Sequence, residues 1–393
     1  MFNSRKKEEA RLLESFGKLK DESFYFDKID RYFRKNIPSG TLQTIDDKTW
    51  NDLDMDEIFM FLDRTQSQIG QQYLYHTLRS IPNSGQLADQ REKLIQQLQQ
   101  HPNLKKNLLY HLSRLYGHDT YFINMLFQHN HMTRPGWFWL VPVLSFLSVA
   151  SIVGVFFMPP FLLLIVLLLA VNLGIHYWNK KNLYHYSGAI IQFIKLKQVV
   201  KEILKNPELK TDNERLRSSV QQVDHISKKF WLFKLESKVQ SDAGQVAEFI
   251  LELIKGFFLL EPLLLFSAIH DIDSKRDAVE CLYQFIGELD VALSVLAIRE
   301  NSENYCLPQF DEGKRINAKE MYHPLVVNCV TNHIDTSGLS ILLTGSNMSG
   351  KTTFIRTLAS IAFWPKPSTC ALPKVSLYNG PEYSLPFAYP MIL

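Results

Sequence analysis

The residues with the clearest chemical potential follow the spacing Gly-x-x-x-x-Gly-Lys-Thr, from Gly345 to Thr352. Two glycines at this separation let successive backbone N–H groups turn inward around an anion, because glycine adopts backbone angles that other residues avoid. Lys351 would then supply a positive charge to the β- and γ-phosphates, and the Thr352 hydroxyl is suited to bind magnesium. The spacing predicts a phosphate-binding loop.

Such a loop needs a strand before it and a helix after it. An apolar run from Leu339 to Leu343 precedes the loop and predicts a strand, and a helical pattern follows from Thr353 to Phe363. The positive N-terminal end of that helix would face the phosphates. The alternative is a glycine-rich turn that happens to carry a lysine.

The loop resembles that of the MutS mismatch-repair ATPases, whose pattern is Gly-Pro-Asn-Met-(Gly or Ser)-Gly-Lys-(Ser or Thr)-Thr. The pair Asn347-Met348 is the distinctive part, and Ser346 stands in place of the proline. Upstream, Tyr322-His323-Pro324-Leu325-Val326 is similar to the His-Pro segment that opens the ATPase domain of that family.

The resemblance implies that the chain binds ATP with Mg²⁺, and that Thr352 is the metal ligand. It implies that the nucleotide-binding residues are Gly345, Ser346, Asn347, Met348, Ser349, Gly350, Lys351, Thr352 and Thr353. It further implies ATP-controlled DNA binding in mismatch repair, with ATPase domains that pair in a homodimer. Mismatch readers of the family carry an N-terminal Phe-x-Glu motif, which residues 1–45 lack. We therefore expect contacts to the DNA backbone rather than to a mismatch.

The length and composition suit a protein of two or three domains. The chain has 393 residues, 46% of them apolar, and a net charge of +3, which says little about partners. The four cysteines are far apart and form no Cys-x-x-Cys pair, which argues against a zinc site and a disulfide framework. A reducing compartment is the simpler expectation.

The strongest break in composition is an uncharged stretch, residues 137–178, which contains no Asp, Glu, Lys or Arg. Pro159-Pro160 divides it into runs of about 21 and 18 residues, each long enough for a hydrocarbon core of about 30 Å. Tryptophans and a tyrosine lie at the outer ends, and Lys180 and Lys181 follow. These features predict a transmembrane hairpin in the inner (cytoplasmic) membrane with both termini in the cytoplasm. The alternative is a buried helical pair in a soluble core.

Helical periodicity on both sides of this stretch predicts one interrupted core and lever domain. Residues 50–79 resemble the opening of the MutS core, where Asp63-Arg64-Thr65 precedes a helix, and residues 288–297 resemble its returning lever helix. We expect Asp63 and Arg64 to form a local ion pair or helix cap rather than a catalytic pair. Between Lys195 and Lys238, eleven Lys or Arg stand against six Asp or Glu, which suits DNA phosphates, anionic lipid or a solvated helix face.

The predicted fold class is mainly α, with a helical core and lever interrupted by a two-helix transmembrane hairpin and followed by the start of a P-loop α/β domain. The expected divisions are residues 1–45, an N-terminal helical segment; 46–130 and 184–305, the two parts of the core and lever; 135–180, the hairpin; and 306–393, an incomplete ATPase domain.

No apolar strand ending in Asp-Glu follows the loop, so the sequence lacks the acidic Walker B half of a hydrolytic site. Prolines punctuate the last 29 residues, and we expect a truncation or a frame-shifted tail after about Pro373. Whether the chain is an enzyme therefore stays open. Two other functions also remain: a transporter-type ATPase, and a membrane scaffold with a vestigial loop.

Overall fold

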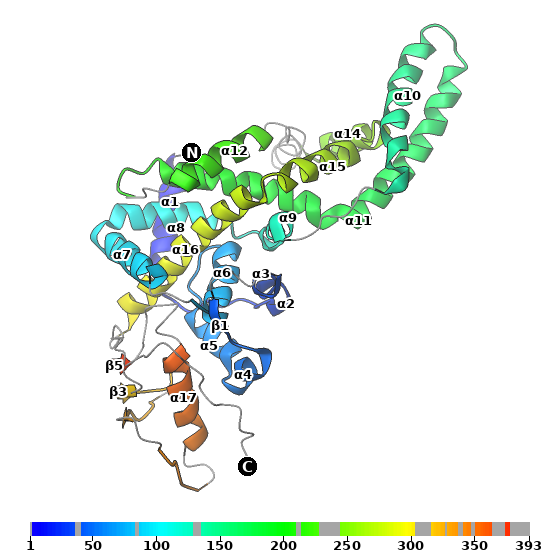
Figure 1. The fold of residues 1–393 in the computed structure, drawn as a ribbon. Helices are drawn as coiled ribbons and strands as arrows, with labels where there is room; N and C mark the ends of the chain where they lie inside the picture. Colours follow the sequence, from blue (N-terminus) through cyan, green and yellow to red (C-terminus); the bar gives the residue numbers. More distant parts are fainter. Residues whose placement is uncertain are drawn as a thin grey trace.

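Amphipathic helices built from the periodic segments of the sequence dominate the structure (Figure 1). This computed structural model describes residues 2–35, 41–82, 86–128, 135–209, 214–227, 244–302, 316–326, 328–336, 341–346, 350–363 and 374–377. Within these residues the fold is mainly α, which confirms the predicted class at that level.

The N-terminal part consists of short helices and one two-stranded sheet. Strand β1 pairs antiparallel with β2, and the helical expectation for residues 1–45 misses β1 because four residues are too few for a clear alternation. The elements are α1 (Phe2–Ser15), α2 (Phe26–Ile29), α3 (Arg31–Lys35), β1 (Thr41–Thr44), α4 (Asp47–Asp52), α5 (Met55–Leu62), α6 (Gln68–Arg79), β2 (Ser80–Pro82), α7 (Gln86–Gln100), α8 (Pro102–Ser113), η1 (His118–Phe122) and α9 (Met125–Gln128).

The middle of the chain contains the longest helices. They are η2 (Gly136–Trp139), α10 (Leu140–Val155), α11 (Phe161–Leu204), α12 (Glu214–Ser227), α14 (Gly244–Phe257), α15 (Leu260–Asp273) and α16 (Arg276–Asn301). Helix α11 runs unbroken for 44 residues, straight through the boundary expected between residues 180 and 184. The backbone has no reason to stop there because α11 contains no proline and no glycine lies between residues 180 and 184. One rigid helix therefore joins the apolar arm to the core.

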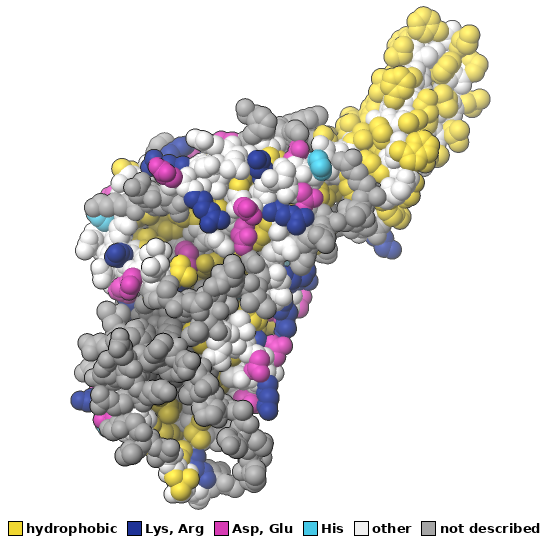
Figure 2. Space-filling view, in the orientation of Figure 1, with side chains coloured by type: hydrophobic (Ala, Val, Ile, Leu, Met, Phe, Trp, Pro, Cys, Tyr) yellow, Lys and Arg dark blue, Asp and Glu magenta, His cyan; other side chains and the backbone are white. Residues whose placement is uncertain are grey.

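The arm formed by α10 and the first half of α11 projects from the rest of the molecule (Figure 1). Its surface is covered by apolar side chains (Figure 2). Gly136–Val155 and Phe161–Lys181 are each long and apolar enough to cross a membrane, and only 17% of each is buried. Arg276–Asn301 also meets the length and composition criterion, but it is 83% buried and forms the centre of the core.

One hydrophobic core combines helices from both sides of the arm. Residues of α5 to α8 pack with the C-terminal half of α11 and with α12, α15 and α16 in a single buried cluster. Helix α16 lies against both α6 and α7, which come from more than 170 residues earlier in the chain. The segments before and after the arm thus bury their apolar faces against each other.

The C-terminal part is a small sheet and one helix. Strands β3 (Ile316–Met321), β4 (Asn332–Asp335) and β5 (Lys374–Leu377) form an antiparallel sheet in the order β4-β3-β5. Helix α17 (Lys351–Phe363) packs Phe354 and Leu358 onto the small cluster of this sheet. Strand β5 lies in the proline-punctuated tail, where the sequence shows no recognisable strand and helix pair.

Candidate nucleotide-binding site

The helix predicted after the glycine-rich loop is present and begins within the motif itself. Helix α17 starts at Lys351, and the N–H group of Phe354 donates to the Gly350 carbonyl over 2.9 Å as its first helical bond. Gly350 has a φ of +78° and Gly345 a φ of +154°, so both occupy backbone regions that favour glycine. A side chain added at Gly350 would meet no described heavy atom within 4 Å, so backbone conformation rather than crowding demands glycine there.

The described side chains of the loop suit an anion. The ammonium group of Lys351 donates to the Gly345 carbonyl, so the lysine folds back over the mouth of the loop. Thr352 is exposed, and the first turn of α17 contains no acidic residue. Because the first N–H groups of a helix lack intrahelical partners, this end attracts negative charge.

The strand expected before the loop is not observed. Residues 341–346 have no regular structure, and Leu342 is 88% exposed. The apolar run therefore does not form a buried strand over its described part, because none of the described strands pairs with it. Leu339 and Ser340 lie outside the described residues, as do Asn347, Met348 and Ser349. The structure brings together Gly345, Gly350, Lys351 and Thr352.

Helix α17 is also attached to the N-terminal part of the chain. Arg356 forms an ion pair with Asp54, which has a left-handed φ of +50° just before α5. Ala359 belongs to the main core, and Tyr322 packs against it. Burial, with the nearby Arg356 guanidinium, lowers the pKa of His323, so this buried histidine is held neutral. Sequence reasoning missed Arg356 and Asp54, because no local pattern pairs residues so far apart.

The Asp63-Arg64-Thr65 segment has a structural role. Asp63 is buried at the end of α5 and accepts from Lys20 over 2.9 Å and from the Thr65 hydroxyl over 2.6 Å. The Arg64 guanidinium donates to the carbonyl oxygens of Gly17, Phe61 and Asp63. Asp63 occupies the C-cap position of α5, where its backbone N–H donates to the Phe59 carbonyl, and the charged partner of its carboxylate is Lys20 rather than Arg64.

The segment after α5 is hydrogen-bonded to α16, although the arm lies between them in the sequence. The buried carboxylate of Asp290 accepts from the N–H of Gln66 at 2.7 Å, and from the N–H and hydroxyl of Ser67 at 2.8 and 2.6 Å. A side chain at Gly70 would lie 2.1 Å from this carboxylate, so only glycine fits there. Ser294 accepts from the N–H of Arg64 over 2.9 Å. The two segments that carry the sequence resemblance therefore contact each other directly.

Known proteins related to this chain are mismatch-repair proteins. It is 29% identical over 119 residues to the DNA mismatch repair protein MSH3 of Meyerozyma guilliermondii, which covers 28% of this chain and 12% of that protein. It is 39% identical over 92 residues to MutS of Halalkalibacterium halodurans, a match that covers 21% of this chain and 10% of that protein. It is 28% identical over 153 residues to MutS of Desulforapulum autotrophicum, which covers 37% of this chain and 17% of that protein. No protein-family model matches.

The chain is MutS-like. The matches span only 10% to 17% of the length of these relatives, so they relate part of this MutS-like chain to part of each one. Activities and partners of whole MutS proteins accordingly belong to the proposals below.

The basic excess expected between Lys195 and Lys238 is partly neutralised in the described residues. Asp224 of α12 pairs with Lys201 and with Lys197, the latter over 2.9 Å, and Glu202 pairs with Lys205 over 2.8 Å. Residues 210–213 and 228–243 lie outside the described part. Three described lysines of this segment are therefore already paired with carboxylates.

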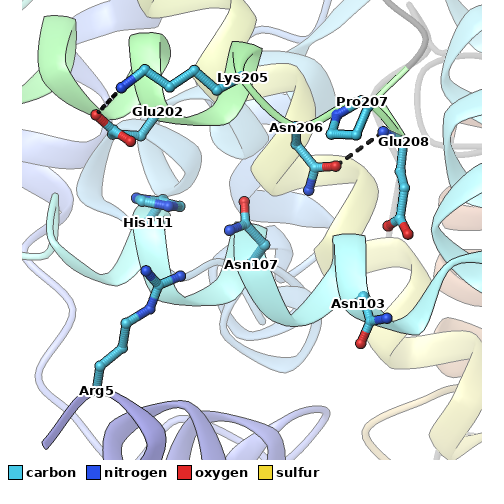
Figure 3. A pocket seen from close by; sticks show the side chains of 9 residues that line it. All are labelled: Arg5, Asn103, Asn107, His111, Glu202, Lys205, Asn206, Pro207 and Glu208. Carbon is cyan, nitrogen blue, oxygen red and sulfur yellow. Dashed lines mark hydrogen bonds and ion pairs between the residues drawn. The ribbon is translucent and has the colours of Figure 1, made fainter. Parts of the chain in front are cut away.

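A hollow of about 430 Å³ lies among α1, α8 and the end of α11 (Figure 3). Arg5, His111 and Glu202 come from these three elements and point toward it. Burial and the neighbouring arginines lower the pKa of His111 to about 4, so it is neutral at physiological pH. The lining mixes both charges, which gives this hollow no preference for a nucleic-acid phosphate.

Proposed function

We propose that this MutS-like chain binds ATP–Mg²⁺ at residues 345–353 and uses the bound nucleotide to control DNA binding at a membrane. The observation that carries the nucleotide proposal is the arrangement around Gly350. Its left-handed φ of +78° leads directly into the first turn of α17, where Lys351 and the exposed Thr352 follow. The spacing of the motif, the conformation of Gly350 and the start of α17 at Lys351 all support one anion-binding site.

The chain's own residues have distinct parts in this proposal. Lys351 exchanges its bond to the Gly345 carbonyl for bonds to phosphate oxygens, since a charged acceptor is the stronger partner. The Thr352 hydroxyl would hold Mg²⁺, and the free N–H groups at the start of α17 would bind the phosphates. The chemistry that Mg²⁺ would supply when bound is neutralisation of the phosphate charge. Gly345, Ser346, Asn347, Met348, Ser349 and Thr353 complete the proposed site.

The membrane part of the proposal rests on the surface of the arm. Leu163, Val166 and Leu167 of α11 are mostly exposed, and so are Phe146 and Val153 of α10. A soluble protein rarely exposes so large a continuous apolar surface, whereas a bilayer buries it. We therefore propose that residues 137–178 anchor the chain in the cytoplasmic membrane, with the core and α17 in the cytoplasm.

DNA binding and dimerisation are proposed from the relatives alone. The similar proteins are named DNA mismatch repair proteins, and we propose backbone-driven DNA binding and homodimerisation through nucleotide domains. A transporter-type ATPase also combines membrane helices with a phosphate-binding loop. A scaffold with a vestigial loop would bind neither nucleotide nor DNA.

A filter-binding assay with the purified chain in detergent separates these functions. We expect duplex DNA to be retained at low salt, with retention falling steeply as salt rises, because phosphate contacts release counterions. ATP–Mg²⁺ should change retention by the wild type and not by Lys351→Ala. Nucleotide binding without DNA retention at any salt concentration would favour the transporter-type alternative. Absence of both would favour the scaffold.

A further inference from the structure

Helix α14 has its apolar face outward and its charged face inward. Val246 is 74% exposed and Phe249 is 64% exposed, and the same stripe continues along the helix through Ile250, Leu253 and Ile254. On the opposite face Lys255 is buried, and Glu252 is half-buried. A helix on the surface of a soluble core has the reverse arrangement. Contact between this stripe and water is therefore unfavourable.

The helix lies along the base of the arm and points toward the middle of α11. The Glu252 carboxylate contacts Lys180, whereas one turn later a side chain at Gly256 would lie 2.7 Å from Leu173. Asn172 donates to the carbonyl oxygen of Phe257 over 2.7 Å. Helix α14 therefore runs antiparallel to α11 and ends near Asn172, roughly 9 Å inside Trp178 at 1.5 Å per residue. Trp178 is the last residue of the proposed anchor, so that depth is somewhat less than a third of a hydrocarbon core of about 30 Å.

The charges between α14 and the arm neutralise one another. Nε2 of His176 lies 3.1 Å from Glu252, and Nζ of Lys255 lies 2.8 Å from the other oxygen of the same carboxylate. Glu261 of α15 lies 3.7 Å from Nδ1 of His176. His176, Glu252 and Glu261 place possible metal ligands within 4.8 Å of one another. The ammonium groups of Lys180 and Lys255 already compensate the carboxylates, so paired charge is the better account.

Three backbone groups in the turn between α14 and α15 bond to protein groups. The N–H of Phe258 donates to Ile254 over 3.1 Å, and the N–H of Leu259 donates to Gly256 over 3.2 Å. The carbonyl of Phe257 accepts from Asn172. Non-helical backbone at membrane depth is tolerated when protein groups pair it in this way.

We propose that α14 and the start of α15 form a re-entrant pair in the cytoplasmic leaflet, with lipid acyl chains covering the outward stripe of α14. The inference rests on the proposed membrane anchoring and adds a second membrane-inserted element. At 14 residues α14 is about 21 Å long, too short to span, so it enters and turns back. Its stripe continues the exposed apolar surface of α11, which favours lipid over a second protein as the occupant.

Spin labels can test this placement in the full chain reconstituted into phosphatidylcholine–phosphatidylglycerol vesicles. The labels are placed by Phe249→Cys and Leu253→Cys in a background whose four native cysteines are replaced by alanine. Label relaxation is measured with oxygen, which concentrates in lipid, and with a water-soluble nickel complex. Leu167→Cys on the arm reports whether the hairpin is inserted, and Lys48→Cys on α4 reports water.

We expect the Leu253 label to be oxygen-accessible and nickel-protected, and the Phe249 label, about 6 Å nearer the membrane surface along the helix axis, to be less protected from nickel. Nickel access at Leu253 with Leu167 in lipid would overturn the re-entrant pair and leave the hairpin intact. Protection from both reagents at Leu253 would mean that protein covers the stripe, which also overturns the inference. Nickel access at Leu167 would instead refute the membrane proposal itself.

Discussion

The guanidinium of Arg356 on α17 forms an ion pair with the carboxylate of Asp54, the residue that precedes α5. The two residues are separated by 302 positions in the sequence, so the pair links the helix after the proposed nucleotide loop to the start of the core. Asp54 has a left-handed φ of +50°. A movement of α17 would therefore act directly on the start of α5 through this ion pair.

The Arg356–Asp54 pair should contribute a small but measurable coupling. Both side chains are about one-third exposed or more, so we expect about 0.5 kcal/mol in a double-mutant cycle of Asp54→Asn and Arg356→Gln by thermal unfolding. Asparagine tolerates the left-handed backbone, so the cycle isolates the charge. A coupling of zero would show that the pair does not hold α17 to the core.

Asp290 should contribute much more to the free energy of unfolding than the Arg356–Asp54 pair does. Asp290→Ala leaves the N–H groups of Gln66 and Ser67 buried without an acceptor, and we expect a loss of about 3 kcal/mol or more. The matched control on the same helix is Glu300→Ala, which breaks a more exposed pair with Lys105 and should cost under about 1 kcal/mol. Equal melting temperatures for the two variants would contradict the proposed importance of this contact.

His76 should contribute a loss of stability on mild acidification. Burial lowers the pKa of His76 to about 4, so the folded state keeps it neutral while the unfolded chain takes up a proton near pH 6.5. The contribution is present above about pH 6.5 and is lost toward pH 4, by on the order of 3 kcal/mol. His76→Gln should flatten the pH dependence of thermal unfolding over this range. An unchanged slope would assign the acid sensitivity to other groups.

The arm should keep the protein on membranes through an alkaline or high-salt wash. Apolar insertion is not screened by salt, unlike attraction between Lys180 or Lys181 and anionic lipid. Lys180→Gln with Lys181→Gln is the control and should remain in the pellet. The span proposal would be wrong if the intact wild-type chain appeared in the supernatant.

The sequence predicted helices well where one face of a long segment meets the core. Helices α7, α8 and α17 follow from apolar residues at helical spacing. Periodicity does not say which face points inward, so α14 resembles an ordinary amphipathic helix until its exposed Phe249 and buried Lys255 are seen together. The expected strand at Leu339 to Leu343 is not formed in its described residues, because strands need partners that a local pattern cannot supply.

The candidate site was only partly predictable for a related reason. Loop spacing predicts Gly350, Lys351 and Thr352 because the phosphate contacts are local in sequence. Asp54 carries no local signal for Arg356, and nothing around Ser67 identifies Asp290 as its partner. These buried or half-buried polar contacts depend on how distant helices pack, and packing is a property of the whole chain.

The most direct test of the account is ATP binding by the wild type and by Lys351→Ala, measured by titration in the presence of Mg²⁺. Removing the ammonium group takes away the charge opposite the phosphates and leaves the Gly350 turn in place, so we predict at least tenfold weaker binding. Lys319→Ala, which removes a lysine from β3 instead, should bind ATP as the wild type does. Equal affinity of the wild type and Lys351→Ala would contradict the nucleotide site.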